Sequence, residues 1–285
     1  MISSRIDSFR SVAKNFKVVF LDSYGVLKNH KGLIDGVAET ISFLRGEGIV
    51  FRVLTNDASR SQEQQVEVFD RLGLKDLDVE EVITSGMLAK QFLSHKIKDG
   101  KIAYLGTENS ADYILQSGLK HIAVRDIDLE NIEDISAFVF LDDEGFDWNY
   151  DIDTTVNFLR RKTVPVIVAN SDKYYPVNKN DVSVATGGIA KLCESMLSKK
   201  FIHFGKPDTQ MFNYAYEHIN RDKQQYDKDD ILMVGDTLST DILGGNKFGL
   251  KTMLVLSGNT RSDNAELWIN SSGIIPDYIC DSILK

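Results

Sequence analysis

The chain has 285 residues, of which 42% are hydrophobic and 26% charged, and its formal net charge is -9 at pH 7. This composition is that of a soluble globular protein, and the length fits one large or two moderate domains. The acidic balance and the lack of Lys/Arg clusters argue against binding to nucleic acid or to an anionic membrane. A phosphorylated small molecule remains a candidate ligand, because its site needs only local positive groups.

The sequence shows no pattern that would direct the chain to a membrane. No apolar run approaches the ~18 residues that span a bilayer, and the first residues lack the uninterrupted apolar segment of a signal peptide. The two cysteines, Cys193 and Cys280, lie far apart in the sequence, as expected in a reduced compartment. We therefore expect a cytoplasmic protein without membrane association.

Short β-rich runs alternate with helical patterns along the chain. Residues 17–22 and 49–56 are predicted strands, and residues 36–48 and 61–74 show the spacing of amphipathic helices. Further strands are predicted over residues 101–106, 136–142, 164–170, 200–205, 230–236 and 251–256. This alternation is typical of βαβ units, and it predicts an α/β fold with a doubly wound parallel sheet.

Chemically active side chains stand where four of these predicted strands end. The strand ends carry Asp22, Thr55 with Asn56, Lys206 and Asp236. Ligands of open α/β sheets bind beyond the carboxyl ends of the strands, so these residues would converge if the four strands are neighbours. A single polar residue at a strand end is usually a turn former or a helix cap. Four together favour a functional site.

These residues resemble the four motifs of the haloacid dehalogenase (HAD) superfamily. The similar segments are Asp22-Ser23-Tyr24-Gly25-Val26-Leu27, Leu54-Thr55-Asn56, Gly205-Lys206-Pro207 and Gly235-Asp236-Thr237-Leu238-Ser239-Thr240-Asp241. The last is specific, because two acids stand five residues apart after an apolar strand. The long interval between the second and third motifs resembles subclass IIA, the nucleotidase-like and p-nitrophenyl-phosphatase-like enzymes, in which an α/β cap domain is inserted there.

The resemblance implies a Rossmann-like HAD core made of residues 1–85 and 187–285, with the cap over residues 86–186. In this subclass the cap closes over the strand ends and selects the substrate. The loop over residues 170–175 is a candidate for that selection, and a plain solvated turn is the alternative. Caps of this subclass often pair, so a homo-oligomer through the cap is a further expectation.

The resemblance also implies a Mg²⁺-dependent phosphatase that acts on a small phosphorylated metabolite. Asp22 would attack phosphorus and form an aspartyl phosphate. Mg²⁺, which prefers oxygen ligands, would bind to Asp22, the backbone carbonyl of Tyr24 and Asp236, with Asp241 as direct or indirect support. The alternative for Asp236 and Asp241 is a purely structural role at a helix N-terminus, which favours acids.

Three further residues would bind the phosphoryl group. Lys206 would hold the transferring group as a point charge and offset its repulsion with Asp22. Thr55 and the backbone N–H of Asn56 would complete the phosphate cradle. The alternative for Lys206 is a surface lysine before a turn-forming proline.

The chain departs from the family pattern at Tyr24, where phosphatases of the superfamily usually carry a second aspartate. That aspartate protonates the leaving oxygen and then activates the hydrolytic water. A phenol with a reference pKa of ~10 can donate a proton near neutral pH but is a poor base for the water step. Loss of a positioned acid–base group typically costs ~10²–10⁴-fold in rate. We expect a phosphatase that is slow or restricted to good leaving groups, such as aryl or acyl phosphates.

Two alternatives stay open. The first is a non-catalytic protein that binds a phosphorylated ligand through the retained cradle. The second is a 2-haloacid dehalogenase-like enzyme, because Asp-x-Tyr-Gly is similar to the first motif of that branch, in which the aspartate attacks carbon and halide leaves without a proton. That branch needs no metal, and it places its cap between the first and second motifs, where the interval is short in this chain.

Overall fold

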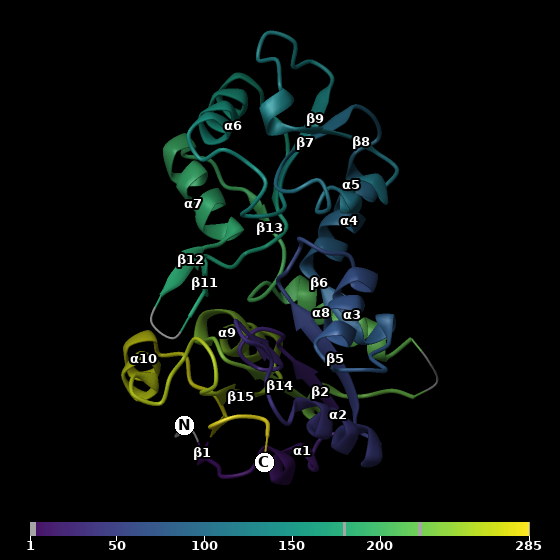
Figure 1. The fold of residues 1–285 in the computed structure, drawn as a ribbon, viewed down its shortest axis with the longest axis vertical. Helices are drawn as coiled ribbons and strands as arrows, with labels where there is room; N and C mark the ends of the chain where they lie inside the picture. Colours follow the sequence, from purple (N-terminus) through teal and green to yellow (C-terminus); the bar gives the residue numbers. More distant parts are fainter. Residues whose placement is uncertain (1–3, 179–180, 222–223, 285) are drawn as a thin grey trace. The chain divides into compact units, whose positions relative to one another are not determined.

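Figure 1 shows the computed structural model of the chain, which describes residues 4–178, 181–221 and 224–284. The chain divides into two compact units. The first unit takes Met1–Thr55, Gln62–Ile83 and Lys206–Lys285, and the second takes Asn56–Ser61 and Thr84–Gly205. The domain limits expected from the sequence, including a cap over 86–186, stay predictions, and their outermost residues, 1–3 and 285, lie outside the described residues.

The first unit is built on a seven-stranded parallel sheet in the order β1-β16-β15-β14-β2-β5-β6. These strands are β1 (Ser4–Arg5), β2 (Val18–Leu21), β5 (Val50–Thr55), β6 (Val82–Thr84), β14 (Ile231–Gly235), β15 (Lys251–Val255) and β16 (Tyr278–Cys280), beside the antiparallel pair β3 (Lys28–Asn29) and β4 (Gly32–Leu33). The helices are α1 (Phe9–Ala13), α2 (Val37–Gly46), α3 (Gln62–Arg71), η1 (Val79–Glu81), α8 (Thr209–Ile219), η3 (Lys228–Asp230), the π-helical turn η4 (Leu238–Ile242), α9 (Leu243–Phe248) and α10 (Ala265–Ser272).

The central strand β2 lies between β14 and β5, although β14 is encoded far later in the sequence (Figure 1). Val19 of β2 is in register with Leu232 on one side and with Phe51 on the other. All four residues of β2 are apolar and buried. Continuous apolar strands of this kind are typical of parallel sheets covered by helices on both faces. The predicted α/β fold is confirmed.

Helices cover the two faces of this sheet with different side chains. Phe9 of α1, Leu44 of α2 and Phe69 of α3 belong to one buried cluster with side chains of β2, β5, β14 and β15. On the other face α9 approaches the sheet closely: a Cβ at Gly245 would lie 3.3 Å from the Cβ of Met233. Helices thereby cover both faces of the sheet.

One predicted strand lies in a different sheet from the one expected. The strand before Lys206 is β13 (Ile202–His203), and it pairs in parallel with β10 of the second unit through Ile202 and His203. Phe201 packs into the core of that unit. The condition that all four strands are neighbours is therefore not met by β13, although Lys206, which follows it, belongs to the first unit.

The second unit has its own five-stranded parallel sheet in the order β13-β10-β9-β7-β8. Its other strands are β7 (Lys101–Leu105), β8 (Lys120–Ala123), β9 (Ile135–Phe140), β10 (Val166–Val168) and the hairpin β11 (Tyr174–Pro176) with β12 (Val182–Val184). Its helices are α4 (Ser85–Lys96), α5 (Asp112–Leu115), η2 (Val124–Asp126), α6 (Tyr150–Arg161) and α7 (Thr186–Leu197). Over the described ranges of both units, no helix has the length and apolar character needed to cross a membrane.

A buried carboxyl stands at the carboxyl edge of this second sheet. Asp142 follows β9, and only 9% of the residue is exposed. Its Oδ2 accepts a hydrogen bond from Thr107 Oγ1 at 2.9 Å, and its Oδ1 accepts one from the backbone N–H of Asp143 at 2.9 Å. Burial raises the pKa of Asp142 to about 6, because the ionised form loses hydration.

We predict that Asp142→Asn stabilises the protein at pH 8 but not at pH 4. An acid whose pKa is raised on folding holds its proton more tightly in the native state. The free energy of unfolding therefore falls as pH rises from about 4 to about 6. The asparagine removes that loss, which is worth at most about 3 kcal/mol. Urea unfolding of the parent and the variant at both pH values measures the difference, and equal stabilities at pH 8 would contradict it.

Candidate active site

Three carboxylates and one ammonium group meet at the carboxyl edge of the first sheet. Asp22 follows β2, Asp236 follows β14, and Asp241 lies in η4. One carboxylate oxygen from each lies within 4.8 Å of the others. Lys206 Nζ is 2.5 Å from Asp22 Oδ1 and 2.7 Å from Asp241 Oδ1. The structure thus brings together four of the residues that the sequence singles out.

The local backbone explains how the acids reach this edge. The backbone N–H of Asp22 continues the sheet ladder by donating to Val234 O at 2.9 Å. After β14 the chain enters η4, where Asp241 Oδ2 accepts a hydrogen bond from the backbone N–H of Thr237 at 3.0 Å. Gly235 has to be a glycine here, because a Cβ would lie 2.2 Å from the Cβ of Asp241.

Burial dominates the electrostatics of this group. The side chain of Lys206 is 2% exposed, that of Asp241 is fully buried, and that of Asp22 keeps 14% of its surface. Burial and the nearby charge of Asp241 raise the pKa of Asp22 well above its usual range, against the opposing effect of Lys206. Burial alone would lower the pKa of Lys206, but the two carboxylates outweigh it and raise that pKa, so the ammonium stays charged.

The residues fit a divalent cation. Burial and the charge of Asp241 raise the pKa of Asp236 to about 7, because three acids share the compensating charge of Lys206. Mg²⁺ binds carboxylate oxygens and would supply the missing positive charge. Asp22, Asp236 and Asp241 are the side chains that could hold it. The Tyr24 carbonyl stays a predicted fourth ligand.

Two glycines hold the carboxylate of Asp236 from both sides. A Cβ at Gly25 would lie 1.9 Å from Asp236 Oδ2, and one at Gly258 would lie 1.8 Å from the same atom. The backbone N–H of Asn259 donates to this oxygen at 2.7 Å, and Thr237 Oγ1 donates to Oδ1 at 2.7 Å. Gly258 and Asn259 were missed in the sequence, although they follow the predicted strand 251–256 in the same way that Asp22 follows its strand.

Tyr24 carries a neutral phenol. Burial raises its pKa above the ordinary value of 10, the charge of Asp236 adds to the increase, and a backbone hydrogen bond at His30 opposes it. At neutral pH the hydroxyl can therefore donate a proton but cannot accept one as a base.

Thr55 and Asn56 lie on either side of the division between the two units. Thr55 ends β5, the strand beside β2, and therefore stands at the same edge as Asp22. It is 7% exposed. Asn56 is 2% exposed, and its Nδ2 donates to Asp172 Oδ1 at 2.9 Å within the second unit. Asp172 was not expected as a partner of this motif, although it lies in the candidate loop 170–175.

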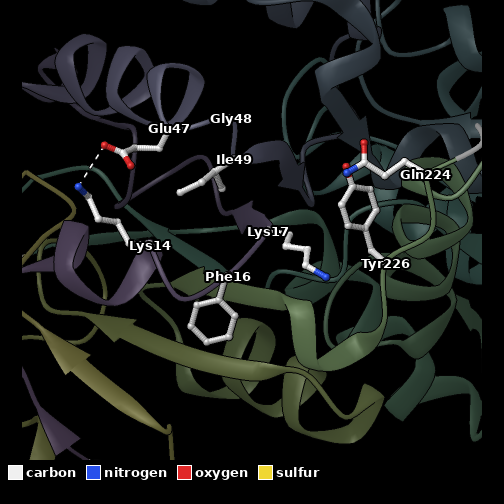
Figure 2. A pocket seen from close by; sticks show the side chains of 8 residues that line it. All are labelled: Lys14, Phe16, Lys17, Glu47, Gly48, Ile49, Gln224 and Tyr226. Carbon is white, nitrogen blue, oxygen red and sulfur yellow. Dashed lines mark ion pairs between the residues drawn. The ribbon is translucent and has the colours of Figure 1, made fainter.

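A small pocket occupies the opposite, amino edge of the same sheet. Figure 2 shows its lining, formed by Lys14, Phe16, Lys17, Glu47, Gly48, Ile49, Gln224 and Tyr226. Its volume is about 170 Å³. Lys14 forms an ion pair with Glu47 at 3.1 Å, and Lys17 forms one with Asp230 at 3.0 Å. Lys17 precedes β2 whereas Asp22 follows it, so this pocket is separate from the carboxylate group.

The chain is similar to several known proteins over most of its length. Residues 19–120 match the family profile "Haloacid dehalogenase-like hydrolase", and residues 203–285 match a HAD-hydrolase-like profile. A solved Cytophaga hutchinsonii structure, described as a possible sugar phosphatase of the HAD superfamily, is 49% identical with a TM-score of 0.95, and 99% of each chain is covered. Chronophin of Bos taurus is 25% identical over 97% of this chain and 94% of its own. Phosphoglycolate phosphatase 1A of Arabidopsis thaliana is 28% identical over 99% of this chain and 80% of its own.

We predict that Mg²⁺ affinity rises with pH between 6 and 8. A carboxyl must lose its proton before it binds a metal, and the pKa of Asp236 is about 7. One such group makes binding about tenfold weaker at pH 6 than at pH 8. Calorimetric titration with MgCl₂ at the two pH values measures the change. A constant affinity over this range would contradict the assignment of Asp236 as a ligand.

A second prediction for this site concerns Gly25 and Gly258, the two glycines on either side of the Asp236 carboxylate. Gly258→Ala should weaken Mg²⁺ binding by about tenfold or more, because the new methyl group must displace Asp236. The matched control is Gly46→Ala, since a Cβ at Gly46 meets no atom within 4 Å. Circular dichroism should show both variants folded. Unchanged Mg²⁺ affinity in the folded Gly258→Ala variant would show that Gly258 does not position the carboxylate of Asp236.

Proposed function

Because the chain belongs to the HAD superfamily of hydrolases, in its subfamily IIA, and is one of its phosphatases, we propose that it hydrolyses a small phosphorylated metabolite through an aspartyl phosphate on Asp22. The observation that carries the proposal is the buried group of Asp22, Asp236 and Asp241 around Lys206. A carboxylate held beside an ammonium group, with two further acids available for a metal, suits nucleophilic attack on a phosphate ester.

Asp22 Oδ2 is the oxygen that we assign as the nucleophile. Oδ1 accepts hydrogen bonds from the backbone N–H of Ser23 at 2.7 Å and from Lys206 Nζ at 2.5 Å. These two bonds fix the orientation of the carboxylate. Oδ2 would form a bond to phosphorus while the bond from phosphorus to the leaving oxygen breaks. Water would then attack phosphorus, release inorganic phosphate and restore the carboxylate.

The remaining residues would neutralise and hold the phosphoryl group. Lys206 would pair with its oxygens, and Thr55 and the backbone N–H of Asn56 would donate hydrogen bonds to them. Bound Mg²⁺ would supply positive charge next to the same oxygens. Lys206 also lowers the pKa of Asp22, against the opposing effects of burial and Asp241, and so favours the ionised form that a nucleophile requires.

Tyr24 would limit the range of substrates. Its neutral phenol is a weak acid for the leaving oxygen, and it is a base for the water of the second step only after it has given up that proton. Turnover would be slow, or fastest for leaving groups that depart without a proton. The relatives are named for phosphoglycolate and for a possible sugar phosphate, so small phosphorylated metabolites are the class to test, together with aryl and acyl phosphates.

We predict that p-nitrophenyl phosphate hydrolysis requires both Mg²⁺ and Asp22. Chelator and Asp22→Asn should each abolish the release of p-nitrophenol, because the first removes charge compensation and the second removes the nucleophile. Tyr24→Asp should raise the rate, and the gain should be larger for glycerol phosphate than for the aryl ester, whose leaving group needs no proton. The gain should lie within the ~10²–10⁴-fold range of general acid–base catalysis.

The control for this experiment is Tyr24→Phe, which keeps the ring and removes the hydroxyl. Hydrolysis that persists in Asp22→Asn, or in the presence of chelator, would refute the mechanism. A parent that binds phosphate but never turns over, even after Tyr24→Asp, would instead identify a binding protein for phosphorylated ligands. Halide release from 2-chloropropionate would identify a dehalogenase-like reaction.

A further inference from the structure

The peptide between Thr55 and Asn56 joins the two units of the molecule. Thr55 ends β5 in the first unit, whereas Asn56 begins the short segment Asn56–Ser61 that belongs to the second. The N–H of this peptide is the donor assigned above to the phosphate cradle. The groups that bond to the side chain and the carbonyl oxygen of Asn56 lie in the second unit.

Asn56 is held on both sides by hydrogen bonds, one part-buried and one buried. Its side-chain Nδ2 donates to Asp172 Oδ1 at 2.9 Å, and its backbone oxygen accepts from Ser85 Oγ at 2.8 Å. Asn56 is 2% exposed and Ser85 is fully buried. Water cannot easily replace the bond to the fully buried Ser85, and the bond to the Asp172 carboxylate is stronger than one between neutral groups.

The backbone before Lys206 packs against the same side chain. Gly205 has a φ of +100°, and a Cβ there would lie 2.5 Å from Asn56 Oδ1. Any shift of the Asn56 amide therefore disturbs the residue that leads directly into Lys206. The side chain of Asn56 thus contacts two segments, one of which continues into the proposed phosphate-binding lysine.

The loop that carries Asp172 is itself well anchored. The backbone N–H of Asp172 donates to Asn170 Oδ1 at 2.9 Å, and its backbone oxygen accepts from the N–H of Gly187 at 2.9 Å. Ser171 Oγ donates to Phe204 O at 2.6 Å. A Cβ at Gly187 would lie 2.5 Å from the backbone carbon of Ser171. This segment is therefore packed against the start of α7 and differs from a plain solvated turn.

We propose that Asp172 is a positioning residue for phosphoryl binding: through Asn56 it orients the cradle N–H and the backbone that leads to Lys206. This inference rests on the proposed function, because it assigns a role to the cradle of that same site. It gives the loop 170–175 a task that does not depend on contact with the substrate.

The test compares Asp172→Ala with Asp172→Asn in the Mg²⁺-loaded protein. The alanine removes the acceptor, whereas the asparagine keeps an amide oxygen that can accept from Asn56. We expect Asp172→Ala to lower kcat/KM for p-nitrophenyl phosphate about tenfold or more and to weaken competitive inhibition by inorganic phosphate by a similar factor. Asp172→Asn should stay within about threefold of the parent. Asp181→Ala is the matched control, because it removes an exposed acid that pairs with Asn178.

A merely structural role would lower the melting temperature of Asp172→Ala without changing the inhibition constant of phosphate. That result would overturn the inference, as would an Asp172→Asn variant as impaired as the alanine. If the parent hydrolyses no phosphate ester, the proposed function fails, and calorimetry of phosphate binding decides the inference separately. Weaker phosphate binding by Asp172→Ala than by the parent supports it. Equal binding, or no binding to either protein, overturns it.

Discussion

The ion pairs of the Lys206 ammonium group with Asp22 and Asp241 are the interactions on which the candidate active site depends. They join residues from the beginning, the middle and the end of the chain, at 2.5 Å and 2.7 Å. Two buried carboxylates without this partner would repel each other, and at least one would take up a proton. The glycine at 235 and the π-helical turn η4 serve the same contact, because they let Asp241 approach.

Two acids of this site, Asp22 and Asp236, could be predicted from the sequence because each interrupts an apolar pattern, whereas Asp241 was identified through the family motif. A run of apolar residues that ends abruptly in a carboxylate is visible without a structure, as at Asp22 and Asp236. The sheet to which β13 belongs was not predictable in this way. Its two residues, Ile202 and His203, are half-buried, and a short apolar strand looks the same in either sheet. β13 belongs to the second sheet because it pairs with β10, and no pattern in the neighbouring sequence indicates that pairing.

The contacts that support the site residues could not be predicted from the sequence for a related reason. Asn259 acts through its backbone N–H, and Gly258 acts by lacking a side chain, so neither role depends on a chemically distinctive group. The bond from Asn56 to Asp172 joins residues 116 positions apart. Hydrophobic periodicity reports helices and strands, whereas such contacts depend on the tertiary fold. The residues of a motif can therefore be identified from the sequence, whereas the contacts around them can be identified only from a structure.

The insertion of the second unit between β6 and Lys206 also shapes how the chain reaches its native state. The central strand β2 pairs with β14 through Val19 and Leu232, so the first sheet stays incomplete until almost the whole chain is available. The stretch Thr84–Gly205, by contrast, carries its own sheet and hydrophobic cluster within one continuous segment. During synthesis from the N-terminus, this unit can form early, while β2 still lacks its neighbour β14. Asp22, the proposed nucleophile, is thus made among the first residues, but its neighbours Lys206, Asp236 and Asp241 are made much later.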